Sequence, residues 1–540
     1  MTTTTDSATQ ARSSFWAPLR QPVFRAIWAA SLLSMTGSWM HDAAASWLMT
    51  SLAPSPAMVA LVQTAMALPM FFLALPAGAL ADIVDRRRLL MVGQSWMMLM
   101  ALTLGILTIL GWTTAWILLL ITFCMGAGLA MSWPAFAATI PDLVPKNELL
   151  SAITLNGVAM NATRAVGPAI GGALIGVIGA GPIFLINGLT YTGILAALAS
   201  WRRPSEKESP LPSERFVGAI RVGLRFALES PPLQYAILRG GLFFFAGVAV
   251  LALLPVIVRD QLKGSPAIFG LMLGAYGTGA ILTAFVLPVL TRFATRDQVV
   301  GLSHFLFAAA LALLSQAGSL PVAIPAVVLA GLSWLLALAT LQVAVQTSLP
   351  SWVRARGLAI FLMVIMGSMA AGSAFWGLVA RAFSIATSLE IAAVTLVLSA
   401  AATWRFSLSS EREDLTPIAT WTDGGVTVSP MGHRGPVEVL VEYRIPDENR
   451  EPFIAAMRDI RQIRRRNGAY SWALYEDINE PGTFIETFMD DSWHDHLRRR
   501  LRLTAADQAA QDRVNALQVT PGPPRVRQLL AQELPRPNRT

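Results

Sequence analysis

The chain has a single cysteine, Cys124, and very few charged residues before residue 405. One cysteine cannot form a disulfide within the chain, so a small fold held together by disulfides is excluded. Residues 1–404 carry only 22 Lys or Arg and 13 Asp or Glu. Charged residues normally cover the surface of a soluble protein, so this low density argues that most of this part does not face water.

Motifs of the common enzyme classes are also missing from the sequence. It contains no G-x-x-x-x-G-K-[ST] loop, which argues against an ATP-driven pump, and no nucleophile–base pair or cofactor fingerprint. We therefore expect no catalytic residue, no cofactor and no bound metal. The net charge of +8 consists of +9 in the first 404 residues, where basic side chains fall in short loops, and −1 in the rest, so we expect no nucleic-acid partner.

Long apolar stretches make up most of the first 404 residues. A bilayer core about 30 Å thick needs about 20 mostly apolar residues per helix, because backbone polar groups in lipid must be satisfied within the helix. The sequence predicts twelve such helices, at about 23–50, 57–80, 89–110, 114–139, 151–178, 182–201, 233–258, 266–291, 297–317, 321–348, 354–381 and 384–404. We therefore expect an all-α polytopic membrane protein, with the lipid bilayer as a partner.

Lys and Arg are concentrated in alternate loops between these stretches. Cytoplasmic loops are rich in Lys and Arg, so these loops and both termini are predicted to be cytoplasmic, in a bacterial inner (plasma) membrane. The basic loops contain Arg86–Arg88, Lys146, Arg202, Arg203, Lys207, Arg292, Arg296, Arg354 and Arg356. The opposite loops contain only Arg259, Lys263 and Arg381.

The composition changes sharply near Trp404, which marks the main predicted domain boundary. Residues 405–540 carry 19 Arg, no Lys and 20 Asp or Glu. Between the two halves, a surface helix at about 213–229 is predicted, with Phe216, Ile220, Leu224 and Ala227 on its apolar face. The predicted domains are a disordered N-terminal tail (1–22), a six-helix bundle (23–201), a cytoplasmic connector (202–232), a second six-helix bundle (233–404), a linker (405–435) and a cytosolic domain (436–534).

The last predicted domain combines the alternating apolar and polar residues of β-strands with the apolar spacing of helices. Apolar residues at every second position from Val437 to Ile445 predict a strand, and Phe453, Met457, Ile460 and Ile463 predict a helix. Strands at Tyr470–Glu476 and Thr483–Met489, a helical region at about 492–517 and a short strand near Val526 follow. This β-α-β-β-α-β order predicts a small α+β ferredoxin-like domain, similar to the dimeric barrels of antibiotic-biosynthesis monooxygenases. We interpret His494, His496 and the nearby aspartates as solvated surface rather than a metal site.

One loop carries a family signature. The run Gly78-Ala-Leu-Ala-Asp82-Ile-Val-Asp85-Arg86-Arg87-Arg88 resembles the G-x-L-x-D-x-x-G-R-[RK] loop of the major facilitator superfamily. Asp85 departs from it by replacing the second glycine. The resemblance implies a cytoplasmic gating motif in which Asp82 pairs with arginines and a helix N-terminus.

Two further stretches narrow the resemblance. Gly167-Pro168-Ala-Ile-Gly171-Gly172 resembles the GPxxGG motif of exporter members, although Thr154 and Thr163 replace its upstream glycines. The tail, with Arg464-Arg465-Arg466-Asn-Gly and Ser492-Trp-His-Asp-His, resembles that of the transmembrane secretion effector group, which includes the enterobactin exporter. These resemblances imply proton-coupled efflux of small molecules such as siderophores or drugs, by alternating access. The alternatives are an exporter whose tail also has monooxygenase-like activity, and an inward permease.

Ionisable residues inside predicted spans are the candidate site, because each costs several kcal/mol to insert. Asp42 and Arg164, with Asn161 and Asn156, are expected to bind the coupling proton or line the central cavity. Alternatively, Asp42 is a hydrogen-bonded structural carboxylate and Arg164 locks helices together. Arg239 is expected to extend its charge to the cytoplasmic interface. The expected partners are a small-molecule substrate, protons and a second copy bound through the C-terminal domain.

Overall fold

A computed structural model of the chain describes residues 15–201, 216–350, 352–408, 434–520 and 522–532. Its contacts divide the chain into two units. The larger unit comprises Met1–Pro212, Ile237–Leu341 and Leu362–Phe406, and the smaller one comprises Ser213–Ala236, Gln342–Phe361 and Ser407–Thr540. Most of the predicted linker at 405–435 lies outside the described residues, and so does the first part of the predicted N-terminal tail. The later part of that tail contains a short 3-10 helix, η1, at Ala17–Arg20.

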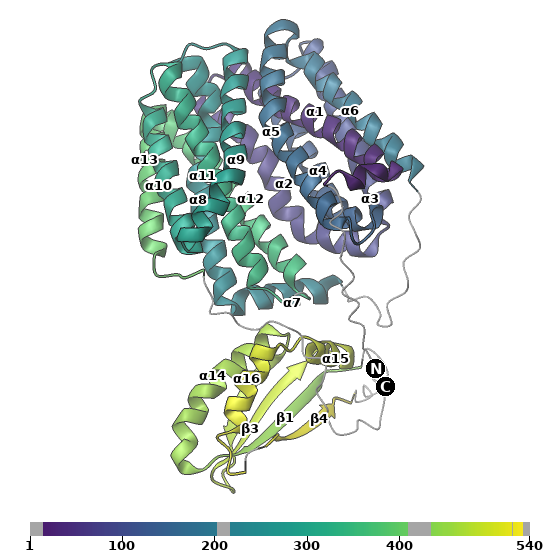
Figure 1. Cartoon of the computed structure of the whole chain (residues 1–540), viewed down its shortest axis with the longest axis vertical. Helices are drawn as coiled ribbons and strands as arrows, with labels where there is room; N and C mark the ends of the chain where they lie inside the picture. Colours follow the sequence, from purple (N-terminus) through teal and green to yellow (C-terminus); the bar gives the residue numbers. More distant parts are fainter. Residues whose placement is uncertain (1–14, 202–215, 351, 409–433, 521, 533–540) are drawn as a thin grey trace, which may run out of the picture. The chain divides into compact units, whose positions relative to one another are not determined.

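Long helices make up almost all of the larger unit (Figure 1). The first half contains α1 (Pro22–Leu52), α2 (Pro56–Ile83), α3 (Arg86–Ile109), α4 (Ala115–Leu143), α5 (Leu149–Ile178) and α6 (Ala180–Ser200). The second half contains α8 (Pro231–Val256), η2 (Ile257–Gln261), α9 (Pro266–Phe293), α10 (Arg296–Ser315), α11 (Leu320–Thr347), α12 (Arg354–Ala382) and α13 (Ile385–Thr403). These helices coincide with the twelve predicted apolar stretches to within a few residues.

Ten of the described helices are long and apolar enough to cross a membrane, by length and composition. Helices α1 and α5 are not among the ten, so the expectation of twelve spans is met only in part. The reason lies in their sequences. Helix α1 contains His41 and Asp42, and α5 contains Asn156, Asn161 and Arg164. The two helices that are least like ordinary spans are therefore the two that carry the candidate site.

Local sequence signals define where several of these helices begin. Thr114 caps α4 by accepting a hydrogen bond from the Ile117 amide, and Thr295 forms a reciprocal capping box with Gln298 at the start of α10. Such caps satisfy backbone amides that have no partner inside the helix. Proline occupies one of the first positions of α1, α2 and α9, where its missing N–H costs nothing.

The two halves of the larger unit meet in the middle of their helices, where a Cβ on Gly367 of α12 would lie 2.5 Å from a ring carbon of Phe71 on α2, and near one end. We call it the Thr50 end, because α1 finishes there; the opposite end carries Arg86–Arg88. Ser373 on α12 donates to the Ala60 carbonyl on α2 at 2.6 Å, and the Arg259 guanidinium donates to the Thr50 carbonyl. Gly172 on α5 packs so closely on Gly270 of α9 that an added Cβ would lie 2.5 Å from its Cα. These three contacts join helices of the first half to helices of the second.

A four-stranded antiparallel sheet forms the core of the smaller unit. Its elements in chain order are β1 (Val437–Arg444), η3 (Asp447–Asn449), α14 (Arg450–Arg466), β2 (Tyr470–Glu476), β3 (Thr483–Asp490), α15 (Trp493–Leu501), α16 (Ala505–Asn515) and β4 (Arg525–Leu530). Across the sheet the strands lie in the order β2-β3-β1-β4. The predicted order of elements is confirmed, except that the second helical region is two helices, because Thr504 caps a new helix in a capping box.

One face of this sheet is covered by helices. Val437, Val439, Val441 and Tyr443 of β1 are buried with Phe453, Met457 and Ile460 of α14 in one hydrophobic cluster. Figure 1 shows α14 and α16 side by side along the sheet. The side chains between them in β1, such as Glu438 and Glu442, remain half-exposed on the other face. This is the alternation that the sequence predicts.

The smaller unit also contains the connector helix α7 (Phe216–Glu229), which confirms the predicted helix there. Its buried side differs from the prediction, because Phe226 and Ala227 are buried while Leu224 is 45 % exposed. The side chains of Phe216 and Ile220 lie outside the described residues. Helix α14 accounts for the difference: Arg465 forms an ion pair with Glu229 at 3.0 Å, and Arg466 stacks on the Phe226 ring at 5.7 Å.

Candidate functional site

Arg164 of α5 lies against α1 inside the larger unit. Its guanidinium stacks over the indole of Trp39 at 5.3 Å from the ring centroid. The Arg164 Nε is buried without a hydrogen-bond partner. No ion pair of Arg164 occurs among the described residues, so the alternative of a helix-locking ion pair is not what the structure gives. A cation held by an aromatic face keeps its donors free for another group.

Tyr276 of α9, in the second half of the chain, lies close to Arg164. It is 4 % exposed, and its hydroxyl is buried without a hydrogen-bond partner. Its hydroxyl lies near enough to the Arg164 guanidinium to be influenced by that positive charge. Close packing of α5 on α9 produces this proximity, because a Cβ on Gly277 would lie 2.4 Å from the Ala165 Cα. Neither Trp39 nor Tyr276 is among the site residues predicted from the sequence.

Asp42 follows Trp39 by one helical turn on α1 and is half-buried. Within the described residues its carboxylate has no hydrogen bond and no ion pair, so the structure does not support a hydrogen-bonded structural role. Tyr191 of α6 lies close enough to sense its charge, and the Tyr191 hydroxyl is hydrogen-bonded to Ser38 at 3.1 Å. The neighbouring His41 is different: it is buried, and its ring packs on Phe184 at 4.5 Å.

The surroundings of the two asparagines of the predicted site indicate less about their roles. Asn161 precedes Arg164 by one turn, and its side-chain amide donates to the Gly157 carbonyl of its own helix at 2.9 Å. Asn156 lies further toward the start of α5 and is half-buried. The structure thus places Arg164 on Trp39, and Asp42 one turn further along α1 near Tyr191. Asn161 precedes Arg164 by one turn, and Asn156 lies beyond it.

The Gly167–Gly172 stretch, which resembles the GPxxGG motif, forms the packing surface of α5. A Cβ on Gly167 would lie 2.6 Å from the Cβ of Trp39, and one on Gly171 would lie 2.9 Å from the Cα of Met40. Both glycines therefore let α5 approach α1. Gly172 faces α9 instead, at the contact between the two halves. Pro168 is buried within this stretch of α5. Small residues at these positions are what close helix approach requires.

The predicted gating motif joins helix ends within the first half. The Arg87 guanidinium donates to the Leu198 and Ala199 carbonyls at the end of α6, both at 2.7 Å. Arg86 donates to the Ala138 carbonyl of α4 at 3.1 Å and pairs with Asp142 at 3.5 Å. These bonds satisfy carbonyls and negative dipole ends at helix C-termini.

Asp85, the residue that departs from the signature, has a clear structural role. Its carboxylate caps α3 by accepting a hydrogen bond from the Arg88 amide at 2.9 Å. The side chain of Asp82 lies outside what the structure describes. Gly78 has no atom within 4 Å of the position where a Cβ would sit, so packing does not require a glycine there.

Arg239 does not extend to an interface as expected. It is 4 % exposed and forms an ion pair with Asp297, whose backbone carbonyl it also contacts at 3.2 Å. Its guanidinium also donates to the Phe406 carbonyl at 3.2 Å. Arg239 therefore ties α8 to the start of α10 and to the chain after α13. Nothing in the sequence pattern indicates Asp297 as its partner.

In the tail, the expected solvated surface is partly wrong. His496 and Asp490 are both 2 % exposed, and the His496 Nδ1 lies 2.8 Å from the Asp490 carboxylate. Burial acts to raise the pKa of Asp490, but the charge of Arg499 and the hydrogen bond from His496 bring it below its ordinary value. Among the described residues, no group of three or more His, Cys, Asp or Glu is arranged to hold a metal ion.

Comparison with known proteins gives the family context of this geometry. The profile of the transmembrane secretion effector family matches residues 13–536. The staphyloferrin A transporter of Staphylococcus aureus is 26 % identical over 372 residues, which is 68 % of this chain and 92 % of that protein. Macrolide efflux protein A of Streptococcus pyogenes is 23 % identical over 55 % of this chain and 74 % of its own length.

Two further similarities agree. The enterobactin exporter EntS of Shigella boydii is 26 % identical over 49 % of this chain and 62 % of its own length. Among solved structures, a bacterial homologue of the human lysosomal transporter Spinster, in an inward-facing and unoccupied conformation, has a TM-score of 0.60. It is 16 % identical and covers 72 % of this chain and 97 % of its own, so this likeness concerns the fold alone. These relatives are transporters rather than enzymes.

Proposed function

The chain belongs to the transmembrane secretion effector family of the major facilitator superfamily, and from that premise we propose that it is a proton-coupled exporter of small molecules. It works by alternating access across a bacterial inner membrane. The observation that carries this proposal is a pair of ionisable groups inside the helices. Asp42 is half-buried on α1, and Arg164 stacks on Trp39 close to Tyr276 of the other half. A transporter needs ionisable groups at the place where its two halves meet.

Alternating access is supported by the uneven contact between the halves. The contacts Ser373–Ala60, Arg259–Thr50 and Gly172–Gly270 gather at the Thr50 end. With twelve spans and both termini cytoplasmic, as the basic loops predict, that end faces outward. The arrangement then corresponds to a state closed to the outside. Breaking these contacts and forming others at the Arg86–Arg88 end produces the opposite state.

Asp42 is the proposed site of proton coupling. Its carboxylate has no internal partner among the described residues, so it is free to exchange a proton with water that enters the open side. Protonation removes a negative charge from α1, close to Tyr191 of α6, and so changes the electrostatic balance inside the first half. Arg164, held over Trp39, supplies the positive charge that attracts an acidic or hydrogen-bonding group of the cargo.

An export assay with matched variants tests this proposal. Inside-out vesicles are energised with an acid interior, and uptake of radiolabelled erythromycin or enterobactin is measured, because relatives are named for macrolides and enterobactin. Asp42→Asn, at equal protein level, is expected to lose pH-driven uptake by about tenfold or more, since each 1.4 kcal/mol of lost coupling is one factor of ten. Asp459→Asn, which makes the same change at an acid of the tail that is 62 % exposed, serves as the control and is expected to transport normally.

Two results would contradict the proposal. Unchanged pH-driven uptake by Asp42→Asn would remove Asp42 from the coupling step. Uptake by right-side-out vesicles in place of inside-out vesicles would favour the inward permease.

For the tail, we propose a ferredoxin-like domain that pairs with a second copy through its open sheet face. On that face, Glu442 of β1 lies opposite Arg525 of β4, and Leu440 lies opposite Arg527. The neighbouring Leu529 is 42 % exposed. A two-fold axis through this face sets acidic β1 residues against basic β4 residues of the other copy. Cross-linking through Leu529→Cys tests the pairing, and a purely monomeric protein would reject it.

A further inference from the structure

Trp352, in the loop between α11 and α12, packs between the connector helix and the C-terminal sheet domain. Its indole meets the ring of Phe226 on α7 edge to face, with 5.7 Å between the ring centroids. On the other side, the Arg502 guanidinium of the domain lies over the same indole, at 4.4 Å from its ring centroid. Leu349 and Val353, on either side of Trp352, are buried. Loops normally run over the surface, so this burial indicates a specific docking contact.

The C-terminal domain holds Arg502 in one position. Arg502 directly follows α15, is 7 % exposed, and donates through its guanidinium to the Asn467 carbonyl at 3.1 Å. Helix α15 is itself fixed to the sheet, because the Arg499 Nε donates to the buried Asp490 carboxylate of β3 at 3.0 Å. A cation fixed over an indole is attracted to the negative face of the ring. The domain therefore binds the Trp352 side chain.

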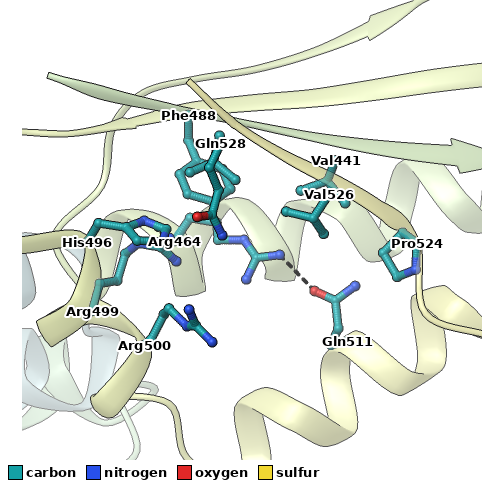
Figure 2. Close-up of a pocket in the computed structure, with 11 residues that line it drawn as sticks. Val441, Arg464, Phe488, His496, Arg499, Arg500, Gln511, Pro524, Val526 and Gln528 are labelled. Carbon is teal, nitrogen blue, oxygen red and sulfur yellow. Dashed lines mark hydrogen bonds between the residues drawn. The ribbon is translucent and has the colours of Figure 1, made fainter. Parts of the chain in front are cut away.

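Buried hydrogen bonds stiffen the domain behind this contact. Arg464 of α14 donates to the Glu486 carboxylate of β3 at 3.0 Å and to the Gln511 side chain of α16 at 2.8 Å. Figure 2 shows the bond between Arg464 and Gln511. Because a buried, hydrogen-bonded network makes a core resist deformation, a movement of the Trp352 loop has to break contacts at the loop itself.

The connector helix α7 is bound to the same domain. Arg225 donates to the Gly468 carbonyl at 3.0 Å, and its guanidinium lies 5.6 Å from the centroid of the Tyr470 ring. At the end of α7, the Gln462 side chain of α14 donates to the Glu229 carbonyl at 2.8 Å. Helix α8 begins two residues after Glu229. The domain therefore holds the start of α8 as well as the loop between α11 and α12.

Three helices of the second half connect this assembly to the larger unit. Helix α8 passes from one unit to the other after Ala236, α11 after Leu341 and α12 after Phe361. Within the larger unit, α12 contacts α2 of the first half at Gly367 and Ser373. Because a helix is a stiff element, a shift of α12 against the first half also moves the helix start that the domain holds.

We propose that the C-terminal domain is a brace for the ends of α8, α11 and α12, with Trp352 as its anchor. The brace has to release before the Arg86–Arg88 end closes, because closure draws the start of α12 toward the first half and away from α7. This inference rests on the alternating access proposed above. It means that the brace stabilises the arrangement in which the halves touch in the middle and at the Thr50 end, and that weakening the brace favours the opposite arrangement.

A disulfide between α7 and α12 tests whether release is needed. A Cβ on Gly223 would lie 3.2 Å from the Cβ of Arg356, which is within a few tenths of an ångström of the separation that a disulfide spans. In a background without Cys124, inside-out vesicles with Gly223→Cys and Arg356→Cys together are oxidised and assayed for pH-driven uptake of erythromycin or enterobactin. Uptake is expected to fall by about tenfold or more, because the locked protein no longer populates the opposite state.

Reduction of the disulfide should restore this uptake. Each single-cysteine variant, oxidised in the same way, is the control and should transport as before oxidation. Normal uptake by the cross-linked protein would overturn the proposal. So would the absence of a cross-link, because the two helices would then not be in contact.

Weakening the anchor tests the opposite direction and needs neither cargo nor a proton gradient. Trp352→Leu keeps an apolar side chain in the loop but removes the ring under Arg502. In the background without Cys124, an impermeant maleimide should then label Thr50→Cys about threefold faster or more, the effect of one lost cation–π contact on the balance between the two states. Arg502→Gln should act in the same way. Trp404→Leu, which removes an indole that is 71 % exposed, is the matched control.

The labelling experiment separates this inference from the export proposal. A protein that exports neither probe but shows faster labelling in Trp352→Leu would retain the brace and lose the proposed cargo. Equal labelling in Trp352→Leu and Trp404→Leu would overturn the brace, even if pH-driven export is observed. Hydrogen exchange across β3 accompanies each measurement, and unchanged protection there shows that the variant domain is folded.

Discussion

At the scale of single residues, three charged groups in apolar surroundings differ in their partners. Arg239 is neutralised by Asp297 and joins helix ends, whereas Arg164 rests on Trp39 without an ion pair among the described residues. In the tail, Asp490 is buried but paired with Arg499 and His496. A buried charge with a partner is structural, and removing that partner is costly. A buried charge without one is a candidate for function.

Asp490→Asn is expected to destabilise the tail by about 3–5 kcal/mol, because it leaves Arg499 buried without its counter-charge. In the folded protein the pKa of Asp490 lies below its ordinary value of 3.8, so the folded form binds fewer protons than the unfolded one. Its contribution is therefore present at neutral pH and is lost as the pH falls below about 4.

Hydrogen exchange across β3 and α15, measured by mass spectrometry between pH 7 and pH 3, checks this. Protection in the variant should be lower at pH 7 and should vary less with pH. Protection equal to that of the unmodified protein at both ends of the range would contradict the expectation.

At the scale of elements, α5 shows how equally spaced glycines acquire unequal roles. Gly172 touches the backbone of α9, whereas Gly176, one turn later, has nothing within 4 Å of an added Cβ. The helix is therefore fitted to its neighbours on one side only. Helix α7 shows the same selectivity, since Phe226 is buried and Leu228 is 66 % exposed.

Gly172→Ala is expected to weaken the contact between the two halves by about 1–3 kcal/mol, because the new methyl group meets backbone atoms of Gly270 that cannot move alone. The Thr50 end should then open more often. In a background without Cys124, the rate at which an impermeant maleimide labels Thr50→Cys should rise. Gly176→Ala is the matched control, and equal labelling of the two variants would count against this role for Gly172.

Phe226→Ala is expected to release α7 from α14, at a cost of about 3–5 kcal/mol, because a buried aromatic ring is lost together with its contact to Arg466. Trypsin should then cleave faster after Arg221 and Arg225, as identified by mass spectrometry of the fragments. Leu228→Ala removes a similarly large side chain from the exposed side and should leave cleavage unchanged. Faster cleavage in both variants would indicate a general loss of structure instead.

At the scale of the whole molecule, the two halves and the C-terminal tail share one membrane orientation. The basic loops predict that Arg86–Arg88 and Arg354 lie on one side and Lys263 on the other. The contacts between the halves extend from the middle of the helices to the Thr50 end, and the arginine motif lies at the opposite end. The orientation of the chain therefore decides which side of the membrane is closed in this arrangement.

Single cysteines at Arg88, Lys263 and Arg354 should reveal this orientation in intact cells. An impermeant maleimide is expected to label Lys263→Cys from outside, and to label Arg88→Cys and Arg354→Cys only in inside-out vesicles. Labelling of Arg88→Cys and Arg354→Cys from opposite sides would mean that the number of spans between them is odd. That result would dismiss the twelve-span arrangement.

The sequence by itself determined the helices, the succession of strands and helices along the tail and the family, because apolar runs, alternation and the 78–88 motif are local patterns. The order of the strands across the sheet came from the structure. It also singled out Asp42 and Arg164, since a charge inside an apolar run is visible without any structure. Only the tertiary structure brought Trp39 and Tyr276 to Arg164, gave Arg239 its partner Asp297 and buried His496. These contacts join residues from separate helices or lie inside a folded core, and packing rather than spacing along the chain decides them.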